Sequence, residues 1–357
     1  MSKVAIIADT HWGIRGDNTL FMDMTKSFLD NVFFPTLQNQ NIDTVVHLGD
    51  LVDKRKQISF LTAQRLRRDF LDKLAENNIR GEFMVGNHDC YFKNTNAVNA
   101  LTELVEGVYP TINIYTEAKE IDLLGTKTLL LPWICDETRQ DSMSLLTSTR
   151  APLCMGHLEI QGFEMYKGSI ATHGEDKQLF DKFDITLSGH YHHRSTSGGV
   201  TYTGSHGEFT WSDYNDPRGF HILDINTRSL EFIQNPYTMF SKLWYNDSGA
   251  NLEKLLDLDS TQVTGKYIKL IVSNKDNPYW FDMVCGKLEK MDPIGIQIVE
   301  DHLNLNLEDA DDIVNEAEGT LDIFRKHINQ IHTANLNKDK LERVITDLYN
   351  QALVVES

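Results

Sequence analysis

Five short segments of this sequence place carboxylate, imidazole or carboxamide side chains directly after apolar runs that predict buried strands. Because neighbouring strands end along one edge of a sheet, segments that are far apart in the chain are expected to meet there. Each segment alone occurs often by chance, but all five, in order and at domain-scale spacing, predict one shared site. In chain order they are Ala8-Asp9-Thr10-His11, Gly49-Asp50-Leu51-Val52-Asp53, Gly86-Asn87-His88-Asp89, Met155-Gly156-His157 and Leu187-Ser188-Gly189-His190-Tyr191-His192-His193.

The side chains of this predicted site are those of a metal centre. Aspartate, asparagine and histidine are hard to borderline donors that suit Mn²⁺, Fe²⁺ or Zn²⁺, and the absence of thiolates argues against a structural zinc site. Two ions about 3.5–4 Å apart share a bridging ligand, and the carboxylate of Asp50 is the predicted bridge. Such a pair activates water and neutralises the phosphate that is attacked, so phosphoester hydrolysis is the expected chemistry.

The elements that position these side chains predict an α/β domain. Strands and helices alternate at first, and from Ile112 to Trp133 strands follow one another, with a hairpin around Gly125. Two sheets packed face to face, with helices outside, accommodate these elements. The predicted strands are Val4–Ala8, Thr44–Leu48, Phe83–Val85, Val200–Thr203, Gly219–Asp224 and Ser229–Gln234, and the predicted helices are Phe21–Leu37, disrupted at Pro35, and Phe60–Leu74.

A domain boundary is predicted near Asn235-Pro236, which divides a domain of residues 1–235 from a small α/β module of residues 236–300. The module is expected to contain helices at Leu252–Leu258 and Trp280–Met291 and strands at Tyr267–Val272 and Ile294–Val299. An acidic linker (301–318) then precedes a C-terminal helical segment (319–357). This segment is predicted to form two amphipathic helices, Leu321–Ile331 and Lys338–Leu353, whose apolar stripes need a cover: a partner's helices, or this chain's own core.

Composition describes a globular protein, since 41% of the 357 residues are hydrophobic. The net charge of −18 argues against wholesale capture of nucleic acid, although a local basic groove is compatible with it. Four widely spaced cysteines argue against a disulfide framework. The sequence shows neither a signal peptide nor an apolar run near the ~20 residues that span a bilayer, so we expect no membrane association and a cytoplasmic protein, in the host cytoplasm if phage-encoded.

The five segments resemble the motifs of the calcineurin-like metallophosphoesterases. Gly49-Asp50-Leu51-Val52-Asp53-Lys54-Arg55 and Gly86-Asn87-His88-Asp89 differ from the GDxVDRG and GNHE motifs of serine/threonine phosphatases and resemble SbcD-type double-strand-break repair nucleases. Leu131-Pro132-Trp133 and the segment from Tyr202 to Phe220 are most similar to nuclease subunits of T-even-phage recombination endonucleases. The resemblance implies a metal-dependent DNA exonuclease or endonuclease for recombination and repair.

The same resemblance implies a role for each candidate residue. Asp9, His11, Asp50 and His192 would hold one divalent ion, and Asp50, Asn87, His157 and His190 the other, with Mn²⁺ expected and Mg²⁺ as the alternative. His88 would hold no metal and would act on the phosphate in the transition state. Asp89 either orients His88 or caps its own turn, and Asp53 has no settled role. Lys54, Arg55 and Trp211 are candidate DNA contacts, although a solvated helix face and core packing explain them equally well.

Partners are also implied by the resemblance. They are DNA and an SbcC-like coiled-coil ATPase that binds residues 319–357, with a homodimer inside a heterotetramer formed through helices such as Arg65–Leu74 and Ala97–Val105. The module at residues 236–300 would then cap DNA ends. Two rival hypotheses are a phosphatase or nucleotide phosphodiesterase on the same metal scaffold, and a nonenzymatic scaffold with a relic site. Because every motif position keeps a ligand side chain, the relic is disfavoured.

Overall fold

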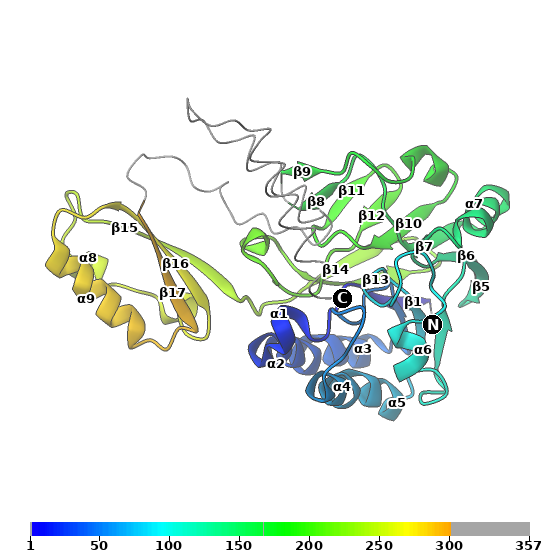
Figure 1. Ribbon diagram of the computed structural model, residues 1–357, viewed down its shortest axis with the longest axis horizontal. Helices are drawn as coiled ribbons and strands as arrows, with labels where there is room; N and C mark the ends of the chain where they lie inside the picture. Colours follow the sequence, from blue (N-terminus) through cyan, green and yellow to red (C-terminus); the bar gives the residue numbers. More distant parts are fainter. Residues whose placement is uncertain (1, 167, 301–357) are drawn as a thin grey trace, which may run out of the picture. The chain divides into compact units, whose positions relative to one another are not determined.

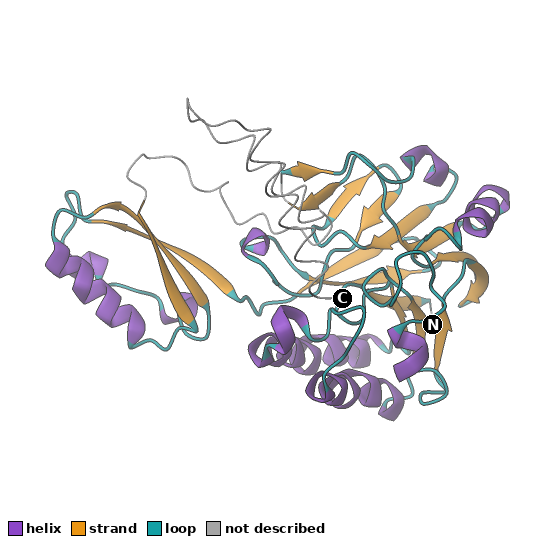
Figure 2. Cartoon of the chain, viewed as in Figure 1, coloured by secondary structure: helices purple, strands orange, loops and turns teal. Residues whose placement is uncertain are grey.

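The structure is a computed structural model that describes residues 2–166 and 168–300. Two six-stranded sheets, a three-stranded sheet and a small hairpin form within these residues (Figures 1 and 2). For this part of the chain the predicted fold class, two sheets flanked by helices with a small α/β module, is confirmed. The predicted acidic linker (301–318) and C-terminal helices (319–357) lie outside the described residues. No helix within the described ranges is long and apolar enough to cross a lipid bilayer.

The first large sheet carries three of the five ligand segments. Strands β1, β2, β3 and β4 run parallel, and β13 and β14 extend the sheet antiparallel beyond β1. Strands β1 and β2 are buried on both faces, which explains their continuous apolar runs. In spatial order the strands are β14 (Leu230–Gln234), β13 (Gly219–Asp224), β1 (Lys3–Ile7), β2 (Thr44–His47), β3 (Arg80–Met84) and β4 (Ile112–Tyr115).

The second large sheet carries the remaining two segments, at the ends of β7 and β10. Strands β6, β7, β10 and β12 run parallel, and the predicted hairpin around Gly125 is confirmed by the antiparallel pair β5 and β6. The order is β11 (Ser195–Ser197), β12 (Val200–Tyr202), β10 (Ile185–Gly189), β7 (Leu153–His157), β6 (Thr126–Leu131) and β5 (Lys119–Leu123), and a separate hairpin joins β8 (Glu164–Tyr166) and β9 (Ser169–Ile170).

Alternating side chains of β1 show how the layers stack. Ala5 and Ile7 pack against the helices, in a cluster that includes Phe70, whereas Val4 and Ile6 belong to a second cluster. That second cluster contains residues of both large sheets, so the sheets pack face to face. Burying each large apolar side chain there contributes about 1.5–3 kcal/mol. The packed sheets bring the ends of β1, β2, β3, β7 and β10 to one edge.

Helices cover the outer face of the first sheet, and two of them begin at a side-chain cap. Asn18 accepts the N–H of Leu20, and Ser59 accepts the N–H of Thr62.

The predicted disruption at Pro35 is wrong, because Pro35 lies in the first turn of a helix, where its missing N–H costs little. The helical elements are α1 (Ile14–Asp17), α2 (Thr19–Phe28), η1 (Leu29–Phe33), α3 (Phe34–Gln40), α4 (Phe60–Leu66), η2 (Arg67–Leu71), α5 (Asp72–Glu76), α6 (Ala100–Leu104), α7 (Arg139–Ser148), η3 (Lys177–Phe180) and η4 (Trp211–Asp213).

The three-stranded sheet belongs to the small module. Its strands are parallel, and one face packs on α9 through a cluster that includes Tyr245, Leu270 and Val284. The predicted helices and strands of the module all appear, with the first helix shorter than expected, but the strand β15 was not predicted. The elements are β15 (Phe240–Asn246), α8 (Leu252–Leu255), η5 (Ser260–Gln262), β16 (Tyr267–Asn274), α9 (Pro278–Glu289) and β17 (Gly295–Glu300).

Candidate metal centre

The ligand segments are loops that leave parallel strands with a strained backbone. Asp9, His11, Asp50 and His190 have positive φ angles of 52°, 41°, 55° and 86°. Non-glycine residues rarely adopt this region, and they persist there only where surrounding contacts fix them. Backbone hydrogen bonds supply such contacts, since the N–H of Asp9 donates to the carbonyl of Gly49 and that of His11 to Asp50, both at 3.1 Å. The first two loops are therefore held to one another.

One cluster of donor atoms comes from Asp9, His11 and His192. One ligand atom of each lies within 4.8 Å of the others. The Nε2 atoms of His11 and His192 are 3.0 Å apart, and the carboxylate of Asp9 accepts the backbone N–H of His190 at 3.0 and 3.2 Å. The last contact fixes the first ligand loop to the fifth, so both sheets contribute to this cluster.

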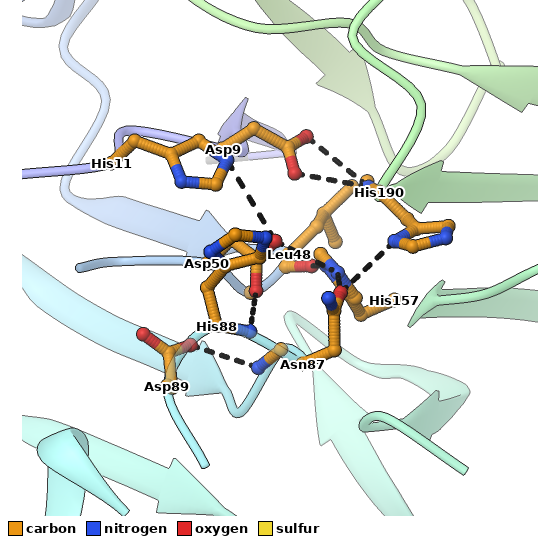
Figure 3. Close-up of polar contacts among 12 residues, drawn as sticks. Asp9, His11, Leu48, Asp50, Asn87, His88, Asp89, His157 and His190 are labelled. Carbon is orange, nitrogen blue, oxygen red and sulfur yellow. Dashed lines mark hydrogen bonds and ion pairs between the residues drawn. The ribbon is translucent and has the colours of Figure 1, made fainter. Parts of the chain in front are cut away.

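A second cluster comes from Asp50, His157 and His190, again within 4.8 Å. The carboxamide oxygen of Asn87 lies 2.9 Å from Nε2 of His157 and 3.0 Å from Nδ1 of His190 (Figure 3). Nδ1 of His157 lies 2.8 Å from the carbonyl of Leu48. When Nδ1 donates to that carbonyl, Nε2 is the nitrogen directed at the cluster, which is how metal-binding histidines are commonly oriented.

Asp50 stands between the two clusters. Its Oδ2 atom lies 3.7 Å from Nε2 of His11 and 3.3 Å from Nε2 of His157, so one oxygen faces both. Its Oδ1 atom accepts the backbone N–H of His88 at 2.8 Å (Figure 3). Although burial opposes its charge, the neighbouring His157 and His88 hold the pKa of Asp50 well below its usual value. Asp50 therefore lies between the two clusters, and its role as a metal bridge stays a prediction.

Burial and neighbouring charges shift the pKa values of these groups in different directions. Burial lowers the pKa of His11 and His190, which keeps imidazole lone pairs available. Burial also disfavours the charge on His157, but the carboxylate of Asp50 outweighs this and raises its pKa to about 9. Within the described residues, Nδ1 of His11 and Nε2 of His190 are buried polar atoms without a hydrogen-bond partner. Carboxylate, imidazole and carboxamide side chains without thiolates fit divalent metal ions.

His88 and Asp53 lie beside the first cluster. Nδ1 of His88 is 2.6 Å from the carbonyl oxygen of Asp53, and Oδ1 of Asp53 is 3.6 Å from Nδ1 of His11. Ligand atoms of His11, Asp53 and His88 also lie within 4.8 Å of one another, so their geometry alone would permit a metal there. The predicted role of His88 outside the ligand set stays a prediction.

Asp89 connects two ligand loops. It is fully buried, and its carboxylate accepts the N–H of Gly86 at 2.8 Å and that of Val52 at 3.0 Å. Burial, together with the charge of Asp50, raises the pKa of Asp89 to about 7. The contact with Gly86 is that of a local cap and the contact with Val52 joins a second loop, while the alternative role of orienting His88 stays a prediction.

The candidate DNA contacts lie outside both clusters. Nζ of Lys54 forms an ion pair with Asp17 at 3.1 Å, and Arg55 is half-buried. Trp211 packs against Phe240 of β15 with ring centroids 4.7 Å apart, and Nζ of Lys269 lies 4.5 Å from its ring centre. Trp211 therefore lies at the junction with the small module, and its contact with DNA stays a prediction.

Three residues beside the clusters were given no role at the site from the sequence, although Trp133 and Phe209 lie in segments that carry the family resemblance. Phe209 lies edge-on to both His11 and His192, with ring centroids 5.8 Å apart in each pair. Trp133 lies 5.2 Å from the His190 ring, and Oε1 of Glu159 is 4.0 Å from Nε2 of His190. Trp133 follows β6 closely, a position that could have drawn attention to it, whereas no spacing marks Phe209.

Comparisons with known proteins agree with this site. Residues 2–194 match the family model of the calcineurin-like phosphoesterases, a range that contains all five ligand segments. Over 352 residues the chain is 28% identical to exonuclease subunit 1 of Enterobacteria phage T4, an alignment that covers 98% of this chain and 99% of that protein. Over 234 residues it is 22% identical to the SbcD component of the SbcCD nuclease of Staphylococcus epidermidis, covering 59% and 58% of the two proteins.

Similarity to solved structures is weaker. A structure described as a novel archaeal phosphodiesterase aligns with 65% of this chain and 99% of its own, at 14% identity and a TM-score of 0.31. That score carries no argument about function. The family match spans more than half of the chain and includes every candidate ligand, and on that ground this protein belongs to the calcineurin-like phosphoesterase family.

Proposed function

We propose that this chain is a two-metal DNA nuclease that hydrolyses phosphodiester bonds during the processing of DNA ends. The observation that carries the proposal is the single oxygen of Asp50 that faces His11 on one side and His157 on the other. Similarity along nearly the whole chain to a phage exonuclease subunit supports DNA as the substrate.

In this proposal each ion has four protein ligands. Asp9, His11, Asp50 and His192 hold the first, and Asp50, Asn87, His157 and His190 hold the second. When bound, the two ions would activate water as the nucleophile and neutralise charge on the phosphate. Mn²⁺ is favoured over Mg²⁺ because four of the seven ligand residues are imidazoles, whereas Mg²⁺ prefers oxygen ligands.

His88 is assigned to the leaving group. The carbonyl of Asp53, 2.6 Å from Nδ1, accepts from that nitrogen and orients the ring. The backbone N–H of His88 donates to Asp50, so the loop that carries His88 is held to the carboxylate proposed to bridge the ions. A protonated His88 donates to the oxygen that departs from phosphorus.

Assembly forms a second part of the proposal. Both relatives are named as parts of larger nucleases, which supports a partner, and we assign residues 319–357, outside the described residues, to binding an SbcC-like ATPase. A homodimer within a heterotetramer and a DNA-capping role of residues 236–300 belong to the same proposal. Deletion of residues 319–357 should abolish co-elution with the ATPase. A truncated chain that still co-elutes with it would refute the assignment.

The activity is tested on end-labelled duplex DNA, circular single strands and small phosphoesters, each with Mn²⁺ or Mg²⁺. We expect cleavage of DNA and of a small diester, faster with Mn²⁺. Hydrolysis of a phosphomonoester or nucleotide without DNA cleavage would instead establish the rival phosphatase or nucleotide phosphodiesterase. A protein that binds metal but hydrolyses none of these substrates would support the other rival, a nonenzymatic scaffold with a relic site.

A further inference from the structure

One ring nitrogen of His190, a proposed metal ligand, lacks a hydrogen-bond partner among the residues that the structure describes. Nδ1 of this ring faces the second cluster, 3.0 Å from the carboxamide oxygen of Asn87, and the opposite edge of the ring is turned away (Figure 3). Nε2 lies on that opposite edge. The side chain is 8% exposed and Nε2 is buried, so bulk water does not replace the missing partner.

Metal binding makes this missing partner more important. When an ion binds at Nδ1, the neutral ring carries its proton on Nε2, and a buried N–H needs an acceptor. The other imidazole of the second cluster already has one, since Nδ1 of His157 lies 2.8 Å from the carbonyl of Leu48. His190 therefore needs an acceptor on the outer side of its ring.

The carboxylate of Glu159 lies on that side. Its Oε1 atom is 4.0 Å from Nε2 of His190. This distance exceeds a hydrogen bond by about 1 Å, a gap that a rotation of the Glu159 side chain can close. Oε1 also lies 3.0 Å from Nε2 of His173, and a carboxylate has enough lone pairs to accept from both rings.

The backbone on both sides of Glu159 is fixed. Glu159 comes two residues after the end of β7, and the carbonyl of Glu159 accepts the N–H of Glu175 at 2.7 Å. The buried hydroxyl of Tyr202 accepts the N–H of Ile160 at 3.0 Å and donates to the carbonyl of Leu158 at 2.9 Å. These contacts keep the carboxylate beside the second cluster.

Glu159 lies outside the groups that could hold an ion directly. Neither Glu159 nor His173 belongs to a set of ligand atoms within 4.8 Å of one another in residues 2–166 and 168–300. The position of Glu159 is that of an acceptor behind a ligand. Such an acceptor fixes the tautomer and orientation of a metal-binding imidazole and increases its basicity.

We propose that Glu159 is a positioning residue of the metal centre, whose carboxylate accepts the Nε2–H of His190 and holds Nδ1 toward the second ion. The inference rests on the proposed function and adds to the proposed site a residue that binds no metal itself. Loss of an acceptor of this kind typically lowers metal affinity by about 10–100-fold.

The test measures Mn²⁺ binding by isothermal titration calorimetry, without any substrate. We expect Glu159→Ala to raise the Kd of one ion about 10–100-fold and to leave the other nearly unchanged. Anomalous peaks at limiting Mn²⁺ should identify the weakened ion as the one beside Asn87 and His157. Glu159→Gln keeps a carbonyl acceptor at the same position and should recover part of the loss.

Glu175→Ala is the matched control. It removes a carboxylate from the strand of chain that pairs with Glu159, but this carboxylate accepts from Arg139 at 2.7 and 3.2 Å. The control should bind both ions as wild type does, and chemical unfolding without metal should be similar in all variants.

Cleavage of a small diester separates positioning from a structural role. Because a weakened ion returns by mass action, Glu159→Ala should approach the wild-type kcat at saturating Mn²⁺, with the half-saturating Mn²⁺ concentration raised by the same factor as the Kd. A distorted loop would instead lower kcat at every Mn²⁺ concentration.

The outcomes that overturn the inference are distinct from those that overturn the nuclease function. Unchanged Mn²⁺ affinity in Glu159→Ala, or an equal loss in Glu175→Ala, would refute the positioning role and leave the nuclease proposal intact. Loss of one ion that saturating Mn²⁺ does not restore would make Glu159 a ligand and also refute that role. If Glu159→Ala weakens one ion selectively but wild type cleaves no DNA, the positioning role stands and the nuclease function is refuted.

Discussion

The metal centre and the small module are built by opposite rules. At the metal centre four of the seven candidate ligands have positive φ, and the buried groups are carboxylates and imidazoles. In the module, Asp292 is the one non-glycine residue with positive φ among residues 238–300, and the cluster under α9 is apolar, although Lys242, Asp247 and Lys269 are also buried. Each strained residue costs about 1–3 kcal/mol. Strain and buried polar groups gather where ligands must converge, which indicates that this edge of the sheets is built for binding at the expense of stability.

Substituting one glycine in each region tests this contrast, and the glycine at the metal centre gives the largest expected loss of activity. A Cβ atom on Gly86 would lie 2.2 Å from Oδ1 of Asp50, whereas one on Gly286 in α9 meets nothing within 4 Å. We expect Gly86→Ala to lower activity by about 10³ or more and to reduce bound metal, because it displaces the bridging carboxylate and the loop of Asn87. Gly286→Ala should stabilise the helix by up to about 1 kcal/mol.

Bound Mn²⁺, measured by atomic emission, and chemical unfolding of both variants check this pair. Equal losses of metal and rate in the two variants would mean that the contrast between the regions is wrong. A Gly86→Ala protein that keeps two ions and full activity would also contradict it.

The next largest effect concerns His88. Its ring lies close enough to His11 and Asp53 to bind a metal ion, but the proposed function assigns it to the leaving group. His88→Gln should lower kcat by about 10²–10³ and leave metal content unchanged, since it removes one donor to the transition state. His11→Gln is the control expected to lose metal. If His88→Gln loses metal in parallel with rate, His88 is a ligand of a site with His11 and Asp53.

The third prediction concerns Glu208, which lies where the larger domain meets the small module. It makes the free energy of unfolding depend on pH. Its carboxylate accepts the N–H of Met239 at 2.7 Å and of Phe240 at 3.1 Å, at the start of β15, and burial raises its pKa to about 7. Between pH ~4.5 and 7 the folded protein binds a proton that the unfolded chain has lost, so the free energy of unfolding falls as pH rises and levels off above pH 7.

Glu208→Gln keeps the acceptor and removes this titration. The difference in the free energy of unfolding, variant minus wild type, should therefore rise by up to about 3 kcal/mol from pH 5 to pH 8. Urea unfolding measures it. The exposed Glu231→Gln on β14 is the control and should track wild type. A Glu208→Gln difference that is constant with pH would mean that Glu208 is ionised in the fold throughout.

The ligands could be predicted from sequence because each lies at the end of a strand or within four residues after it. Asp9 comes two residues after β1, and His190 comes directly after β10, so an apolar run and a polar neighbour are enough to find them. The family resemblance then grouped them, and the structure brings the same residues together. The proposed double role of Asp50 comes from the packing of the sheets, because Asp50 follows β2 in the first sheet and its carboxylate lies beside His157 at the end of β7 in the second.

Other features depend on contacts that no local pattern records. The strand β15 contains a buried lysine, Lys242, so its sequence lacks a clear alternation, and the strand was not predicted. Pro35 predicts a break when read locally, but the π-helical turn η1 before it lets the helical path continue into α3. Phe209 is adjacent to the ligand rings only because the chain returns there after β12.

The central claim, a pair of ions joined by Asp50, is tested most directly by anomalous diffraction from crystals soaked in Mn²⁺. Wild type should show two peaks about 3.5–4 Å apart, one beside Asp9, His11 and His192 and one beside Asn87, His157 and His190. Asp50→Ala should show neither. A single wild-type peak, or one peak that stays at full occupancy in Asp50→Ala, would contradict the bridge.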